Sequence, residues 1–357
     1  MTRWLMAVVV LMPLALLPAS WGVSLPESKT LAFILLGAGT VLLLIRNLWL
    51  RAFAAWTVLA YLLAGAYAFA LTAVAGVLAW AVLHQQARSL PESFWPKVRV
   101  AVLVSALGQV AWLGVQLAGV DPIFTAAPTQ AGTQPTVVPT VGWFGNPMDL
   151  ALYLGLALPL LVAVRPAWLG LAAAGVTAGA ILLLLRATVG AMAVGVTAVW
   201  LLWAWVPSWP GRVGVLLGVG LLGGLYVAAV DPQVGARPLI WRQTAQVIAL
   251  RPFSGYGPNA LDHRVIVMTP ASALRWNFVF NEWLQAWLEL GVLAPMLAAG
   301  YLVSLLRRLR GRAFAAAELT PALAILLLAS LFSIPMRIAP VALLAALVLG
   351  QLDRRLA

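Results

Sequence analysis

The stretch AWLGLAAAGVTAGAILLLL, residues 167–185, contains no charged side chain, and comparable charge-free runs follow at residues 213–230 and 341–350. The hydrocarbon core of a bilayer needs about 20 apolar residues for each helical crossing. Of the 357 residues, 63% are hydrophobic and 9% are charged, whereas a soluble domain carries roughly 25% charged residues. The sequence therefore predicts that lipid surrounds most of this chain.

Apolar runs between charged or proline-rich breaks predict an all-α, polytopic membrane protein with about twelve spans. We expect a single membrane domain over residues 1–357, with spans at 4–20, 30–45, 52–66, 68–83, 98–120, 147–164, 167–185, 189–206, 213–230, 283–306, 320–334 and 338–352. The first run could be mistaken for a signal peptide, and we interpret it as a retained span. Residues 52–83 would form a helix of roughly 48 Å at about 1.5 Å per residue, so we predict two helices there.

The arginines and lysines predict the orientation. A cytoplasmic N-terminus leaves eight of the 22 basic residues outside, which are Lys29, Arg186, Arg237, Arg242, Arg251, Arg264, Arg275 and Arg337. The other 14 (22 minus 8) are then cytoplasmic together with both termini, as the positive-inside rule requires. The net charge is +12, but the charges are dispersed between apolar spans, so no nucleic-acid partner is expected.

The long hydrophilic segment 231–281 is predicted to be external and to begin with an amphipathic helix. Pro238 suits the first turn of a helix, and Pro252 disfavours helix at Arg251. We expect Leu239, Ile240, Val247, Ile248 and Leu250 to face the membrane, and Arg242, Gln243 and Gln246 to face water. Arginines donate paired hydrogen bonds to phosphate oxygens. The external arginines therefore predict a lipid diphosphate as ligand.

Three motifs carry a resemblance to a known family. They are GWFGNPMDLALYLGLALPL at 142–160, which contains Asn146; RPLIW at 237–241 with RPFSGYG at 251–257, which contain Trp241, Gly255 and Gly257; and NEWLQ at 281–285 followed by ELG at 289–291, which contain Asn281, Gln285 and Glu289. In this order the motifs resemble those of the O-antigen ligase and O-antigen polymerase superfamily of bacterial envelope enzymes.

The resemblance implies a GT-C-like glycosyltransferase of the bacterial inner membrane that needs neither metal nor cofactor. Such an enzyme takes a glycan from undecaprenyl diphosphate and attaches it to a hydroxyl of a glycan, lipid A core or protein acceptor. By position, Arg237 would hold the diphosphate. The family's second arginine is replaced by Val189, and Arg186 lies three residues earlier, on nearly the same helix face. Arg242, Arg251 and Arg264 complete the predicted diphosphate-binding set.

The identity of the general base stays open, because Phe280 occupies the place of the family's histidine. His263 has a suitable intrinsic pKa, whereas Asp149 and Glu282 stand at the external mouths of predicted spans, where burial can raise a carboxyl pKa. Glu289 lies deeper, and an acid inside a span is a functional-site hypothesis. The alternatives are a non-catalytic family member and, from another class, a transporter or flippase of lipid-linked glycans. The sequence has no cysteine, so a Cys-ligated metal site is excluded.

Overall fold

The structure is a computed structural model that describes residues 47–63, 71–120, 142–144, 146–206, 208–230, 237–263, 267–268, 275–276, 278–310 and 318–357. The predicted spans at 4–20 and 30–45 lie outside the described residues. Two helices, α3 (Leu48–Leu63) and α4 (Leu71–Ser89), replace the ambiguous stretch 52–83, so the prediction of two helices there is confirmed.

The described chain is helical apart from one short pair of strands. In order it forms η4 (Glu92–Phe94), α5 (Trp95–Leu117), η5 (Gly142–Phe144), α6 (Pro147–Val162), α7 (Ala167–Gly179), the π-helical turn η6 (Ala180–Leu185), α8 (Thr188–Trp205), α9 (Trp209–Val230), α10 (Arg237–Leu250), α11 (Ala260–His263), α12 (Glu282–Leu290), α13 (Leu293–Leu309), α14 (Leu319–Phe332), η9 (Pro335–Arg337) and α15 (Ala339–Arg355). The strands β1 (Val267–Met268) and β2 (Arg275–Trp276) pair antiparallel.

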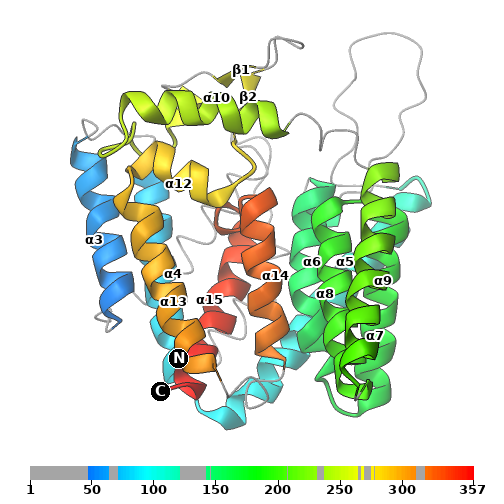
Figure 1. Ribbon diagram of the computed structural model, residues 1–357. Helices are drawn as coiled ribbons and strands as arrows, with labels where there is room; N and C mark the ends of the chain where they lie inside the picture. The colour runs from blue at the N-terminus through cyan, green and yellow to red at the C-terminus, as the bar shows by residue number, and fades with distance from the viewer. Residues whose placement is uncertain are drawn as a thin grey trace.

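Most of these helices stand side by side in a bundle, and α10 lies across one end of it (Figure 1). We call this end the α10 end and the other the opposite end. Helix α12 lies directly beneath α10 and is inclined to the bundle. The expectation of one continuous span over 283–306 is therefore wrong: Gly291, with φ +74°, ends α12, and α13 begins two residues later.

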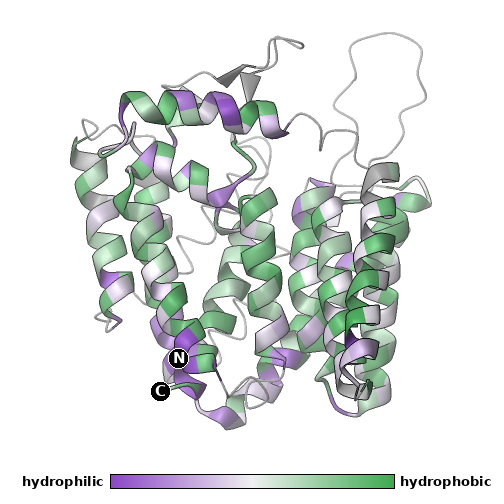
Figure 2. Cartoon of the chain, viewed as in Figure 1, coloured by the Kyte–Doolittle hydropathy of each residue, from purple (hydrophilic) through white to green (hydrophobic). Residues whose placement is uncertain are grey.

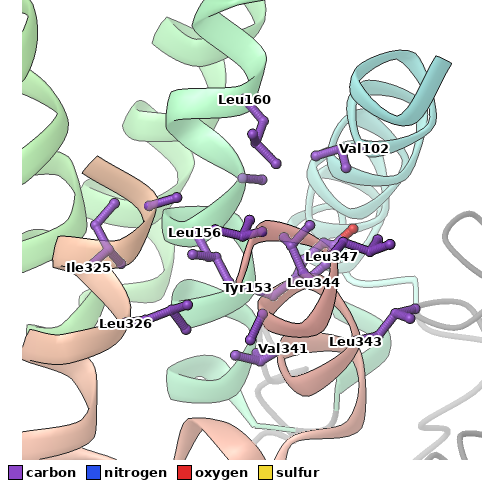
Figure 3. Packing of buried hydrophobic residues seen from close by; sticks show 14 of the residues in the cluster. Val102, Tyr153, Leu156, Leu160, Ile325, Leu326, Val341, Leu343, Leu344 and Leu347 are labelled. Atoms are coloured by element: carbon purple, nitrogen blue, oxygen red, sulfur yellow. The ribbon is translucent and has the colours of Figure 1, made fainter. Parts of the chain in front are cut away.

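The core of the bundle forms around α6 and α15. Every residue from Leu150 to Leu161 of α6 is buried, as is every residue from Ala339 to Asp353 of α15. A helix that is apolar all round belongs in a protein interior. Figure 3 shows Tyr153 and Leu156 of α6 beside Leu344 of α15, with Leu326 of α14 completing the layer.

The outer helices carry apolar side chains on their exposed faces. On α9, Leu217, Leu221 and Leu225 follow each other at four-residue intervals and are 68%, 66% and 61% exposed. Figure 2 shows that hydrophobic residues predominate along the helices of the bundle and that hydrophilic residues concentrate towards its ends. An exposed apolar stripe of this length is typical of a helix that faces lipid. The fold thus fits a membrane protein.

Within the described residues, the helical stretches Glu92–Leu117 and Ala167–Leu185 are each long and apolar enough to cross a bilayer, judged by length and composition. Pro147–Val162, Thr188–Trp203 and Leu319–Phe332 are shorter apolar helices. The total of about twelve spans stays a prediction.

Candidate active site

The start of α12 is fastened to the end of α14 by hydrogen bonds from two side chains, those of Asn281 and Trp283. Asn281 is the N-cap residue: its Oδ1 accepts from the backbone N–H of Leu284 at 3.0 Å, and its Nδ2 donates to the Leu331 carbonyl at 3.1 Å. Trp283 Nε1 donates to Ser330 Oγ at 2.9 Å. The side chain of the motif residue Asn281 thus both caps α12 and fixes its position.

The end of α12 is buried, and its last four carbonyl groups all have partners. The Trp287 and Leu290 carbonyls accept from Gly291 N–H and Trp56 Nε1, at 2.9 and 2.7 Å. The Leu288 and Glu289 carbonyls accept from the N–H groups of Tyr256 and Gly257, at 2.9 and 2.8 Å. Helix ends leave such carbonyls unsatisfied unless other groups reach them. The turn in RPFSGYG therefore completes the hydrogen bonding of the helix that contains ELG.

Two carboxylates and one arginine form the polar centre of this region. Glu289 is 3% exposed, and its Oε1 accepts from Gln285 Nε2 at 2.5 Å. Its Oε2 forms an ion pair with Nη2 of Arg337, whose Nη1 donates to Asn259 Oδ1 at 3.0 Å. The Gln285 Oε1 accepts from the Val279 N–H at 2.8 Å. The buried acid is therefore paired and hydrogen-bonded, as a buried charge must be.

Glu282 is the first residue of α12, directly after the N-cap and at the α10 end of the bundle. Its Oε2 accepts from the backbone N–H of Met336 at 3.1 Å. Although its side chain is only partly buried by area, desolvation by the surrounding protein raises the pKa of this carboxyl to about 7. The nearby Arg337 lowers the pKa and Glu289 raises it, both by smaller amounts than burial. A carboxyl with a pKa near neutrality can accept a proton at physiological pH.

Helix α10 covers α12 with the apolar face that the sequence predicts. Ile240 and Ile248 are buried in one cluster with Val279 and Leu288, and Trp241 Nε1 donates to the Val279 carbonyl at 3.0 Å. Our expectation that Ile240 and Ile248 face the membrane is thus wrong, because α12 supplies the apolar surface that they cover. Leu239 and Leu250 of the same predicted face are 46% and 77% exposed.

The predicted diphosphate-binding arginines occupy different environments. Arg237 is buried at the start of α10, whereas Arg242 is exposed and Arg251 lies over the Tyr256 ring at 5.2 Å. Arg186 is exposed after η6, with a left-handed backbone, and α8 begins only at Thr188. The expectation that Arg186 shares a helix face with Val189 is therefore wrong. Arg264 lies outside the described residues.

The first motif lies where α6 begins. The Asn146 side chain caps α6 by accepting from the Met148 N–H at 2.9 Å, and Asp149 is half-buried in the first turn. The start of α8 is close by, because a Cβ added at Gly190 would lie 2.9 Å from that of Ala151. Arg186 therefore shares an end of the bundle with Asp149.

The remaining predicted bases differ in what the structure shows of them. His263 ends α11, and its side chain lies outside the described part of the chain. Phe280 has a positive φ of 54° and packs against the cluster formed by α10 and α12. The position of the family's histidine is thus filled by a packing residue. Among the described residues, no group of three or more histidine, aspartate or glutamate side chains is placed to hold a metal ion.

Arg337 is the residue of this centre that the candidate list from the sequence missed. The sequence did contain a signal, because Arg337 is an external arginine between two apolar spans, against the usual charge bias. Its distance of 48 positions from Glu289 concealed the pairing.

These features define a class: an all-helical membrane protein with a buried arginine–carboxylate centre at one end of its bundle. Residues 150–299 match the O-antigen ligase family, Wzy_C. The match confirms the predicted resemblance to the O-antigen ligase and polymerase superfamily over these residues, and it supports a glycan-transfer function of the ligase or polymerase type. No curated protein matched the chain significantly.

Proposed function

We propose that this protein transfers a glycan from undecaprenyl diphosphate to an acceptor hydroxyl at the outer face of the bacterial inner membrane, with Glu282 as general base. The observation that carries the proposal is the Glu282 carboxyl, which lies at the start of α12 with a pKa raised to about 7 by burial. It stands two residues after Phe280, so a base remains next to the position of the family's histidine.

In the proposed reaction the acceptor hydroxyl gives its proton to Glu282 while its oxygen attacks the anomeric carbon. The bond from that carbon to the diphosphate oxygen breaks, and the diphosphate leaves with the electron pair. Attack opposite the leaving group inverts the anomeric centre. Arg186 and Arg237 neutralise the charge that develops on the diphosphate, which lowers the barrier electrostatically.

The test is transfer by the full-length chain reconstituted in vesicles with an undecaprenyl-diphosphate oligosaccharide. Glu282→Gln keeps the side-chain shape and removes the proton acceptor, so we expect the rate to fall by about 100-fold or more. The wild-type rate should rise with pH through about 7, because only the ionised carboxylate accepts a proton.

His263→Ala and Asp149→Asn are the comparison variants for the two other candidate bases. A wild-type rate in Glu282→Gln, or a larger loss in either comparison variant, would move the base to another residue. Product ladders formed from donor alone would identify a polymerase, and a requirement for a separate acceptor would identify a ligase.

A further inference from the structure

Arg337 connects three segments that are distant in the sequence. It ends η9, between α14 and α15, and its guanidinium binds Glu289 of α12 and Asn259 of the loop before α11. Its side chain is 21% exposed, and the Glu289 side chain is 4% exposed. The pair is therefore largely removed from water, where a charge interaction is strong.

The same turn also contacts Glu282. The backbone N–H of Met336 donates to Glu282 Oε2, and the charge of Arg337 acts on this carboxylate directly. The Arg337 guanidinium thus stands near two carboxylates. Glu289 forms an ion pair with it, whereas Glu282 accepts the Met336 N–H with Oε2 and has Oε1 left for other contacts. When both acids are ionised the three groups carry a net charge of −1, and a proton on Glu282 makes them neutral.

On the described elements packed against α12, the other acidic or basic groups are arginines, apart from Asp262 and His263 of α11, whose Ala260 and Leu261 share a buried cluster with Leu288. Arg237 and Arg242 lie on α10, and Arg251 precedes the glycine turn. Arg51 on α3 and the arginines at the end of α13 lie at the opposite end of the bundle. The causes of the Glu282 shift that come from charged side chains are Arg337 and Glu289.

We propose that Arg337 is a positioning residue for the transfer reaction: by holding Glu289 and the η9 turn, it orients the Glu282 carboxylate and keeps it ionised. This inference rests on the proposed function. Arg337 exchanges no proton itself. The acceptor's proton passes to Glu282, and the arginine stabilises the carboxylate that must be present before the proton arrives.

The experiment compares pH–rate profiles of full-length variants in vesicles. Arg337→Gln removes the cation, so the rising limb should move to higher pH by about one unit, as expected for the loss of an opposite charge. Arg337→Lys keeps the charge but loses the forked geometry, so its midpoint should stay near the wild-type value while kcat falls. Arg310→Gln, an exposed residue at the opposite end, is the matched control and should change neither value.

Glu289→Gln removes the neighbouring negative charge and should lower the midpoint. The double variant Arg337→Gln/Glu289→Gln leaves neither partner of the ion pair charged, and its midpoint should lie above that of Glu289→Gln. The comparison of the double variant with Glu289→Gln tests the proposal even if Arg337→Gln alone fails to fold. A purely structural role would reduce the active fraction and leave every midpoint unchanged, which would overturn the proposal.

The infrared band of the protonated Glu282 carboxyl, identified by its loss in Glu282→Gln, gives a second readout. We expect its titration midpoint to move with the rate midpoint in each variant. A moved infrared midpoint with an unmoved rate profile would overturn Glu282 as the base, and hence the proposed function. Midpoints that stay fixed in both measurements would overturn the role of Arg337 alone.

Discussion

Arg237 and Arg186, two arginines of one predicted site, differ in their burial and in the structure around them. Arg237 is buried in the first turn of α10, beside the α10–α12 cluster, whereas Arg186 is exposed after the π-helical turn of η6. A buried guanidinium offers fixed geometry, and an exposed one can move toward a ligand. The clamp that these two residues would form on the lipid diphosphate stays a prediction.

The clamp depends on the planar fork of arginine as well as on its charge. Arg237→Lys and Arg186→Lys each keep the charge but lose one of two parallel hydrogen bonds, each worth about 1.5–3 kcal/mol when charged. We therefore expect each variant to lose about tenfold or more of the transfer rate at fixed donor concentration, with expression normalised. Arg310→Lys at the opposite end is the control and should change little. Full activity in Arg237→Lys would contradict the clamp.

At the scale of elements, the contact between the glycine turn and α12 decides the shape of the site. Gly255 has a φ of +65°, and a Cβ there would lie 2.5 Å from the Glu289 carbonyl oxygen and 2.6 Å from the Gly291 nitrogen. Both neighbours are backbone atoms that cannot move aside without disturbing α12. Gly255 is thus required by its conformation and by the close approach of two elements.

Gly255→Ala should therefore destabilise the protein and displace the end of α12. The left-handed backbone alone costs about 1–2 kcal/mol for a residue with a Cβ, and the backbone overlap adds to that cost. We expect a lower midpoint of thermal unfolding in detergent and a reduced transfer rate. Gly218→Ala on α9 is the matched control, because a Cβ there meets nothing within 4 Å. Its midpoint should equal or exceed the wild-type value, and an unchanged midpoint in Gly255→Ala would refute the argument.

At the scale of the whole molecule, the two ends of the bundle differ in the ion pairs that their charged side chains form. At the opposite end, Asp353 accepts ion pairs from Arg88 and Arg308 at 3.4 and 2.5 Å. Glu318 pairs there with Arg99 at 2.9 Å and with Arg355 at 3.4 Å. These four arginines are among those that the sequence assigns to the cytoplasm. Among the arginines that the structure describes, the division between the two ends agrees with the predicted one. The compartment that each end faces stays a prediction.

The absence of cysteine from the sequence makes the orientation simple to test. Arg242→Cys and Arg310→Cys place single thiols at exposed positions near opposite ends. If the α10 end is external, a membrane-impermeant maleimide applied to cells should label Arg242→Cys at once and Arg310→Cys only after permeabilisation. The reverse pattern would place the α10 end in the cytoplasm and would overturn the functional proposal with it.

Much of the architecture was predictable because it follows from local composition. Charge-free runs mark the helices from 147 to 230 to within a few residues, since a long apolar segment in lipid must satisfy its backbone groups within itself. Pro238 and Pro252 likewise bracket α10, because proline favours a helix start and disfavours helix in the residue before it. The three motifs also indicated the family, since each preserves a recognisable local pattern.

Only the tertiary structure shows how these elements pack against one another. The sequence around residues 283–306 reads as one apolar helix, and only the docking of the 252–257 turn explains why it breaks at Gly291. The sequence of α10 does not distinguish an apolar face that covers lipid from one that covers protein. The structure shows that this face covers α12. The pairing of Arg337 with Glu289 is equally invisible in the sequence, because periodicity and spacing report on neighbours within an element. A contact between residues 48 positions apart arises from how whole helices pack, and that packing puts one arginine beside both carboxylates of the candidate site.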